Sequence, residues 1–389
     1  MAANVAIRRC ADYDRDNVHR AVGEAIAAVV DLPTLVRDKR VFIKVNFLSD
    51  APPESAVCTH PEIARALIRW CLEAGAAEVA VGDMPGMHLT DRPELPFERS
   101  GLAPVCREEG ARVAPLSGRG YREVEVPGAR RLHHLMFACE LLDADVVINA
   151  PKLKSHIQAL YTGAIKNWFG AIANRDRKRS HHFTELEPFS ECVVDIFRVR
   201  PPDLTVMDGV IGMEGSGPQE GDPRQLGLVL ASTDAVALDT VSMECVDYSR
   251  MKVPQVRIAA EEGLGEADLS KITIDGPPFD EVRQRFATPP TAFVTMPKFM
   301  TKLAFRFWRI RPEILADKCQ VCGACERMCP VGAISMTPEC AVIDYTNCIE
   351  CFCCHESCPH RAIGEDMTLL YRLHRYIAER KQRRTAIQK

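Results

Sequence analysis

The chain has 389 residues, of which 47% are hydrophobic and 26% are charged, a composition typical of a globular protein with two or three domains. Its net charge of −4 gives no electrostatic reason to expect nucleic-acid binding. No stretch approaches the ~20 apolar residues of a membrane-spanning helix, and the start of the chain lacks the apolar run of a signal peptide. We therefore expect a cytoplasmic protein, which the seventeen cysteines also favour because thiols stay reduced there.

Residues 1–295 alternate short apolar strands with helical patterns, which predicts an α/β domain with a mostly parallel sheet and flanking helices. His60-Pro61 opens a helix that ends at Gly75. The predicted strands are 41–46, 78–83, 145–150, 205–208, 227–231 and 271–274. Polar residues recur where strands end, namely Asn46, Asp83, Lys152 and Asp208. Ligands of open α/β sheets bind outside the carboxyl ends of the strands, so we expect these side chains to converge on one cleft.

The segment 149–170 follows one of these strands, is expected to be helix-forming at first, and carries four potential cations: Lys152, Lys154, His156 and Lys166. Cations beside helix-end amides suit an anion such as phosphate or carboxylate. We expect the lysines to anchor this group together with Asn167, and His156 to exchange protons near neutral pH. The alternative interpretation is a solvated basic loop.

A second segment, 208–221, is rich in glycine and follows a strand, but it matches neither the dinucleotide fingerprint nor a phosphate-binding loop. Gly215 and Gly217 would let the backbone approach a ligand closely. Asp208 and Glu214 are candidates for binding a metal or for acid–base chemistry. The alternative interpretation is a structural turn.

A third segment, 232–239, predicts a helix that Asp234 caps. We expect Asp239, one turn further, to face the cleft or a buried partner. His181 and His182 lie in a charged loop, and we expect a surface position rather than a metal site.

Together these segments resemble domain-of-unknown-function family 362, members of which often carry a C-terminal ferredoxin module. The resemblance covers most of residues 41–245. It rests on Lys44-Val-Asn46, His60-Pro61, Pro151-Lys-Leu-Lys-Ser-His156, Thr162-Gly-Ala-Ile-Lys-Asn167, Asp208-Gly209, Gly215-Ser-Gly-Pro218 and Asp234-Ala-Val-Ala-Leu-Asp239. It implies the architecture and an iron–sulfur character, but no substrate.

Two basic amphipathic helices are predicted, one at 296–317 as a linker and one at 367–389 as the C-terminal segment. We favour packing of their apolar faces inside the protein. A peripheral contact with an anionic membrane, or with an acidic redox partner, is the alternative.

The region 318–366 contains two matching cysteine runs. Each run has the spacing C-x2-C-x2-C-x3-C-P, and the second begins 29 residues after the first. The runs consist of Cys319, Cys322, Cys325 and Cys329, and of Cys348, Cys351, Cys354 and Cys358. This is the ligand pattern of a bacterial ferredoxin with two [4Fe–4S] clusters, in which the fourth cysteine of each run binds the other cluster. A small α+β ferredoxin-like domain is therefore expected.

The alternatives for these cysteines are weaker. Zinc sites usually have paired C-x2-C units without the trailing proline, and disulfide frameworks suit small secreted chains. Cys340 and Cys353 fall outside the repeat and are interpreted as non-ligands, although Cys353 leaves the register of the second run open.

We expect an iron–sulfur oxidoreductase that passes low-potential electrons from an external redox partner protein to a small anionic substrate or cofactor in the cleft. Two alternatives remain. The first is a non-enzymatic electron carrier or redox scaffold that docks a partner protein, and the second is a ligase or transferase with structural clusters.

Overall fold

The computed structural model describes residues 3–86, 94–249, 253–289, 310–368 and 372. The chain forms two compact units, Met1–Pro289 and Pro290–Lys389. The division lies close to residue 295, where the sequence predicts the end of the first domain. Each unit is described by itself.

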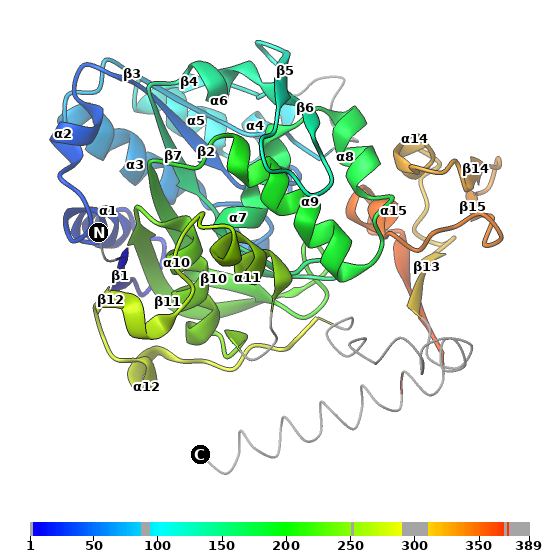
Figure 1. The fold of residues 1–389 in the computed structure, drawn as a ribbon. Coiled ribbons are helices and arrows are strands. Elements are labelled where there is room, and N and C mark those ends of the chain that lie inside the picture. The colour runs from blue at the N-terminus through cyan, green and yellow to red at the C-terminus, as the bar shows by residue number, and fades with distance from the viewer. Residues whose placement is uncertain (1–2, 87–93, 250–252, 290–309, 369–371, 373–389) are drawn as a thin grey trace. The chain divides into compact units, whose positions relative to one another are not determined.

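The first unit is built on a mixed sheet in which most neighbouring strands are parallel (Figure 1). β11 runs antiparallel to both of its neighbours, and the short β9 runs antiparallel to β8. β8 continues from β7 after Pro151 and pairs with the far half of β10. The strands in spatial order are β12 (Ile272–Asp275), β1 (Ala3–Arg9), β11 (Asp222–Ser232), β10 (Leu204–Glu214), β7 (Val146–Ala150), β2 (Arg40–Val45), β3 (Glu78–Gly82) and β4 (Arg112–Val113), with β8 (Lys152–His156) and β9 (Leu160–Thr162) beside β10.

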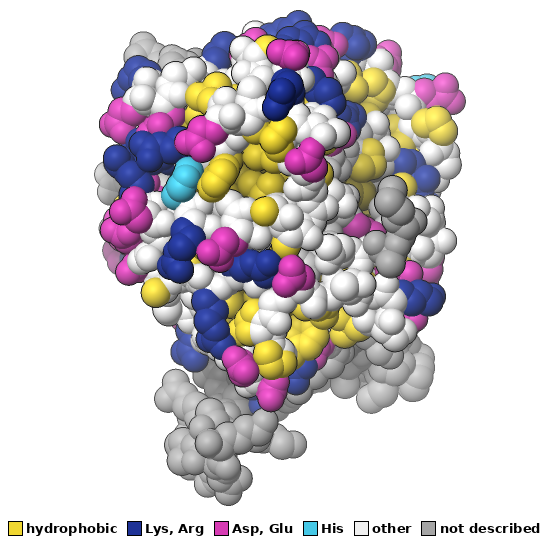
Figure 2. Space-filling view, turned by 90° about the vertical axis from the view of Figure 1, so that its left-hand side faces the viewer, with side chains coloured by type: hydrophobic (Ala, Val, Ile, Leu, Met, Phe, Trp, Pro, Cys, Tyr) yellow, Lys and Arg dark blue, Asp and Glu magenta, His cyan; other side chains and the backbone are white. Residues whose placement is uncertain are grey.

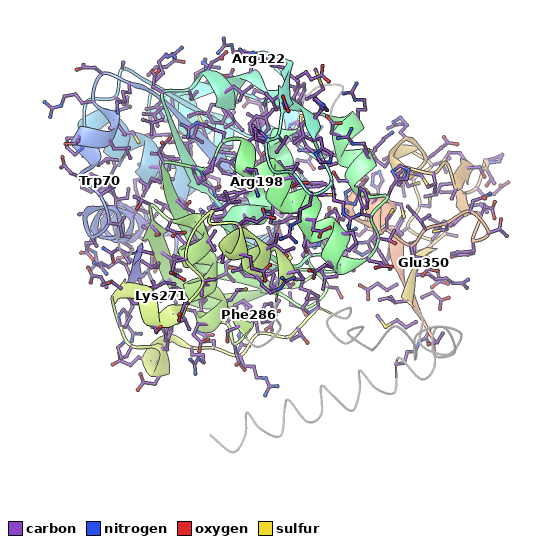
Figure 3. All side chains as sticks on the ribbon, viewed as in Figure 1. Trp70, Arg122, Arg198, Lys271, Phe286 and Glu350 are labelled. Atoms are coloured by element: carbon purple, nitrogen blue, oxygen red, sulfur yellow. The ribbon has the colours of Figure 1, made fainter. Side chains whose placement is uncertain are left out.

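Helices cover both faces of this sheet (Figure 1). One face packs its alternate strand residues, such as Val41, Ile43 and Val45, into a core against α1 (Arg15–Ala27), α2 (Leu32–Val36), α3 (Pro61–Glu73) and α5 (Leu102–Glu108). The other face carries α7 (Ala164–Asn167), α9 (Leu186–Val199), α10 (Ala235–Cys245) and α11 (Pro254–Glu261). Trp70 on α3 and Arg198 on α9 mark the two helical layers in Figure 3.

The remaining elements of this unit are short. They are α4 (Glu94–Arg99), α6 (Cys139–Asp143), α8 (Asn174–Ser180), α12 (Phe279–Val282), the hairpin β5 (Tyr121–Glu125) and β6 (His134–Ala138), and the 3-10 turns Pro53–Ser55, Trp168–Ala171 and Leu269–Lys271. The outer face around α1 and β12 carries acidic and basic side chains side by side (Figure 2). The Arg8–Asp275 ion pair joins β1 to β12. Among the described residues, no helix combines the length and apolar character needed to cross a bilayer.

The six predicted strands and the helix that starts after His60 are confirmed. Two predictions for this unit were wrong. The segment after β7, expected to be helix-forming, begins with the strand β8, because its backbone pairs with β10 and β9. The glycine-rich segment begins as strand rather than as a loop, since β10 continues through Gly209 and Gly212 to Glu214.

The second unit is small and contains two antiparallel strand pairs. β13 (Ile310–Ile314) pairs with β16 (Ile363–Met367), and β14 (Ile334–Met336) pairs with β15 (Ala341–Ile343). Its two short helices, α14 (Ala324–Met328) and α15 (Cys353–Glu356), follow equivalent cysteines of the two runs. This is the expected small α+β unit.

The predicted linker helix at 296–317 is wrong at its end, because residues 310–314 form the strand β13. Pro312 restricts Arg311 to extended conformations, and the strand gains a partner in β16. The rest of this helix up to residue 309, and nearly all of the C-terminal helix predicted at 367–389, lie outside the described residues.

Candidate functional site

The eight cysteines of the two runs are divided between two cavities of the second unit. One cavity is lined by Cys319, Cys322, Cys325 and Cys358. Another is lined by Cys348, Cys351, Cys354 and Cys329. We call these the first and the second cavity. Each takes three cysteines from one run and the fourth from the other, which is the expected crossed arrangement.

The two runs also match in backbone conformation. Val321 and its counterpart Glu350, which Figure 3 labels, both have positive φ angles, 51° and 58°. Gly323 (φ 71°) corresponds to Phe352 (φ 59°). Gly332 (φ 64°) likewise corresponds to Arg361 (φ 50°). The left-handed conformation is therefore required by the loop itself, since it persists where the second run has no glycine.

Hydrogen bonds from backbone amides to cysteine sulfurs also match between the two runs. The amide of Ala333 donates to Sγ of Cys329 at 3.1 Å, and the amide of Ala362 donates to Sγ of Cys358 at 3.2 Å. Such bonds stabilise negative charge on sulfur, as metal-bound thiolates require. Four thiols from two runs around one cavity fit the donor set of a [4Fe–4S] cluster. Cys353 also lines the second cavity, whereas Cys340 lines neither.

In the first unit, Lys152 and Asp208 form a buried ion pair between β8 and β10. Lys152 Nζ lies 2.9 Å from Asp208 Oδ2, and both side chains are fully buried. Burial lowers the pKa of Lys152, and the Asp208 carboxylate opposes this shift. The hydroxyl of Tyr13 accepts a hydrogen bond from Lys152 Nζ and donates one to Asp208 Oδ1, each at 2.7 Å.

His60 connects this network to α3. Its ring stacks on that of Tyr13 with a centroid distance of 3.6 Å, and its backbone amide donates to Asp208 Oδ2 at 2.9 Å. Nδ1 of His60 accepts the amide of Glu62 and so caps the helix. Burial lowers the pKa of His60 to about 4, so its ring is neutral at physiological pH.

Lys154 and His156 continue along β8 and are also buried. Lys154 Nζ donates to the carbonyl of Val57 at 2.6 Å. Nδ1 of His156 accepts the amides of Gln158 and Ala159 at 3.1 and 3.2 Å. Because Nδ1 is an acceptor, Nε2 carries the proton of the neutral ring.

Asn167 lies at the centre of a cluster of amide side chains at the ends of β2 and β7. Its Nδ2 donates to Oδ1 of Asn149 at 2.8 Å, and its Oδ1 accepts from Nδ2 of Asn46 at 3.1 Å. These contacts fasten α7 to the strand ends. Of the four strand-end residues expected to converge, Asn46 belongs to this cluster, Lys152 pairs with Asp208, and Asp83 pairs with Lys44.

Lys166, one residue earlier, packs against aromatic rings. Its Nζ is 3.8 Å from the centroid of Phe169 and 5.4 Å from that of Phe189. His181 contacts the same two rings and is 2% exposed, so the expected surface position of this histidine was wrong. Burial, and then the nearby Lys166 charge, lower the pKa of His181 to about 3. Only His182 of this pair lies in an exposed position.

The glycine-rich segment after β10 packs closely against β8. A Cβ on Gly217 would lie 2.1 Å from the carbonyl oxygen of Ser155, and Gly215 has φ +78°. Glu214 accepts the amide of Ala287 at 2.7 Å. In the described part of the chain, no three His, Cys, Asp or Glu side chains are close enough to coordinate one metal ion.

Asp234 and Asp239 each hold helix amides. Asp234 caps α10 as predicted, accepting the amides of Val236 and Ala237 at 2.9 Å. Asp239 instead accepts the amides of Ala164 and Ile165, at 2.6 and 3.0 Å, and so fixes the start of α7. Burial raises the pKa of Asp239 to about 7.

A second buried ion pair was not predicted. Lys44 Nζ lies 2.7 Å from Asp83 Oδ1, and burial lowers the pKa of Lys44. A Cβ on Gly170 would lie 2.2 Å from the same Asp83 oxygen. The sequence did contain a signal for this pair. The apolar strand 41–46 includes one lysine, and the next predicted strand, 78–83, ends in an aspartate. Tyr13 was also missed, because it lies before a helix, outside any motif.

Comparisons with known proteins agree with the division of the chain into a large first unit and a cysteine-rich second unit. Residues 41–244 match the model of the family described as domain of unknown function DUF362, and residues 312–335 match a 4Fe-4S binding domain. A thylakoid-associated protein of Synechocystis is 30% identical over 268 residues, covering 68% of this chain and 80% of that protein. A ferredoxin of Chlorobaculum thiosulfatiphilum is 40% identical over 55 residues, which cover 13% of this chain and 90% of that ferredoxin.

Among solved structures, the lactate racemase apoprotein of Thermoanaerobacterium thermosaccharolyticum superposes with a TM-score of 0.43 and 13% sequence identity. The match covers 62% of this chain and 57% of that protein.

Proposed function

Since this chain belongs to the DUF362 family and carries a 4Fe-4S binding domain, we propose that it is an electron carrier with two [4Fe–4S] clusters. The observation that carries the proposal is the distribution of eight cysteines over two cavities, four to each. The resemblance of this unit to small ferredoxins supports the same role.

The cluster of the first cavity would be held by Cys319, Cys322, Cys325 and Cys358, and that of the second by Cys348, Cys351, Cys354 and Cys329. When bound, such clusters supply one-electron transfer at low potential. The chain contributes the thiolates, the amides of Ala333 and Ala362 that donate to two of them, and the glycines that let the loops turn.

The direct test is the iron and sulfide content of the purified protein. Protein purified without oxygen should contain eight iron and eight acid-labile sulfide atoms per chain. A Cys340→Ala variant is the matched control and should keep all eight irons, because Cys340 lines neither cavity. Four irons in the wild type would contradict the two-cluster proposal.

We further propose that the electrons pass to a small anionic substrate or cofactor bound by the first unit, which would make the protein an oxidoreductase. The supporting observation is the concentration of buried cations at one edge of the sheet. Lys166 and Asn167 would position the anion, His156 would exchange a proton through Nε2, and the backbone at Gly215 and Gly217 would approach the ligand. Asp208 would hold Tyr13 and Lys152 in place, and Glu214 the backbone of Ala287, through the hydrogen bonds that they accept.

This second proposal predicts a bound ligand. Native mass spectrometry of the anaerobically purified protein should detect a small anion in the wild type that is lost in Lys166→Met. Lys271→Met, which removes a charge from an exposed position, is the control and should retain it. The same absence of ligand in all three proteins would contradict the oxidoreductase proposal while leaving the electron-carrier proposal intact.

A second candidate is a carrier that docks a partner protein and binds no small molecule. It is favoured by the internal contacts of Lys152 and Lys154, whose ammonium groups bind Asp208 and the carbonyl of Val57. An external redox protein is the proposed partner in either case. A peripheral membrane contact is a further proposal, supported by the name of the thylakoid-associated relative. Vesicles of anionic lipid should sediment the protein at low salt if this contact exists.

A further inference from the structure

The second cavity of the second unit is lined by one thiol more than the first. Cys353 lines it in addition to the four cysteines assigned to it above, so five cysteine side chains surround this cavity. The first cavity is lined by four cysteines, and the residue that corresponds to Cys353 in the repeat is Ala324. A [4Fe–4S] cluster takes four thiolates from the protein, so a cluster in the second cavity would leave one of the five thiols without an iron.

Cys353 is hydrogen-bonded to one of the four assigned cysteines, Cys351. The thiol of Cys353 donates to Sγ of Cys351, and the backbone amide of Cys353 donates to the same sulfur. Cys353 is the first residue of α15, so its backbone is part of the element that follows Cys351 in the cavity wall. The fifth sulfur is therefore held beside the sulfur that would bind the iron.

A thiol in this position can exchange with the ligand next to it. Only a thiolate binds iron, so Cys353 must lose its proton when it becomes a ligand. The hydrogen bond supplies the acceptor for that proton. As the bond from iron to Cys351 breaks and a bond from iron to Cys353 forms, the proton passes from Sγ of Cys353 to Sγ of Cys351. The number of thiolates and the oxidation state of the cluster do not change, so the exchange needs neither an oxidant nor a reductant.

We infer that Cys353 is a reserve ligand of the second cavity, able to replace Cys351 at the same iron. This inference rests on the two-cluster proposal. It predicts an asymmetry between the two runs. The second cluster should survive the loss of Cys351, whereas the first cluster should not survive the loss of the corresponding Cys322, because Ala324 offers no sulfur.

The test is the iron content of variants of the whole protein, purified without oxygen. Cys351→Ala should keep eight irons per chain, because Cys353 binds in place of the missing thiolate. Cys351→Ala/Cys353→Ala should fall to four. Cys351→Ala/Cys340→Ala is the matched control and should keep eight, because Cys340 lines neither cavity.

The first run provides the reciprocal test. Cys322→Ala should retain only four irons. Cys322→Ala/Ala324→Cys gives the first run the same cysteine spacing that Cys351→Ala leaves in the second, and it should recover eight. This pair of variants keeps the inference falsifiable if Cys351→Ala does not fold.

The outcomes separate this inference from the proposal on which it rests. Four irons in Cys351→Ala, with eight in the wild type, would overturn the reserve ligand and leave the two-cluster proposal intact. Eight irons in Cys351→Ala/Cys353→Ala would also overturn it, because the cluster would then be held without either sulfur. Four irons in the wild type would overturn the two-cluster proposal and this inference together.

Discussion

Gly163 lies so close to Asp239 that a Cβ on Gly163 would be 2.1 Å from Oδ1 of the aspartate. The same carboxylate accepts the amides of the two residues after Gly163. The segment that carries Lys166 and Asn167 is thereby fixed at its start by Asp239. It is fixed at its end by Gly170, which lies against Asp83.

Gly163→Ala should destabilise the first unit, because the new methyl group has no space between Asp239 and Tyr161. We expect a loss of about 1–3 kcal/mol in the free energy of unfolding, the range of overpacked cores. Urea denaturation followed by the fluorescence of Trp70 and Trp168, in a Trp308→Phe background, measures it. Gly118→Ala, at an exposed site where a Cβ would lie 3.1 Å from the Pro115 carbonyl oxygen, is the control and should cost less. Equal losses in both variants would contradict the account.

Asp239 should make the stability of the first unit depend on pH. Its pKa in the folded protein is about 7, compared with 3.8 for the free side chain, because burial disfavours the ionised form. Between about pH 4 and 7 the unfolded chain therefore loses this proton before the folded protein does. The contribution of protonated Asp239 to the stability of the first unit is complete below pH 4 and is lost as the pH rises through 7.

The comparison with Asp239→Asn isolates this effect, since asparagine does not ionise. The free energy of unfolding of the wild type should fall relative to the variant between pH 4 and 7, by up to about 4 kcal/mol at ~1.36 kcal/mol per pKa unit. Urea denaturation at several pH values measures the difference. Two parallel pH profiles would show that Asp239 does not titrate in this range.

Lys152→Met should destabilise the first unit even without any ligand, because it leaves the Asp208 carboxylate buried without its cation. Removing one member of a buried ion pair typically costs about 3–5 kcal/mol. Tyr13→Phe, which keeps the ring stacked on His60 and removes only the hydroxyl, should cost less, about 1.5–3 kcal/mol. Urea denaturation compares the two. If Lys152→Met left the free energy of unfolding unchanged, this lysine would serve ligand binding alone.

Gly332→Ala should weaken the second unit through backbone conformation only. Gly332 has φ 64°, and a Cβ there would meet nothing within 4 Å. The expected loss is therefore the left-handed cost of about 1 kcal/mol. The rate at which a chelator removes iron from the protein should rise in Gly332→Ala. Glu339→Ala, on the exposed surface, is the control for this rate of iron removal.

Sequence patterns predicted the parts of this protein that depend on local periodicity. The strands around 41–46 and 78–83 follow from short continuous apolar runs, and the helix after His60 follows from proline at its first turn. The cysteine spacing predicted how the eight cysteines of the two runs are divided between the cavities, because the pattern specifies a known geometry, but it did not place Cys353 in the second cavity.

Contacts between distant segments could not be predicted in the same way. The pairing of Lys152 with Tyr13 joins residues far apart in the sequence, and no local pattern encodes it. β8 was missed because four of its five residues, Lys152, Lys154, Ser155 and His156, are polar, so the segment does not read as an apolar strand. Those polar side chains are tolerated inside only because Asp208, the Val57 carbonyl and backbone amides satisfy them.

The crossed assignment of the fourth cysteines is the central claim, and Cys358→Ala tests it most directly. Cysteines of the anaerobic variant would be alkylated and located by peptide mass spectrometry. The account predicts that Cys319, Cys322 and Cys325 gain the label, because Cys358 lines their cavity. The second-run cysteines Cys348, Cys351 and Cys354 should stay protected by the cluster that they share with Cys329. Labelling of Cys348, Cys351 and Cys354 instead would mean that each run holds its own cluster and would contradict the account.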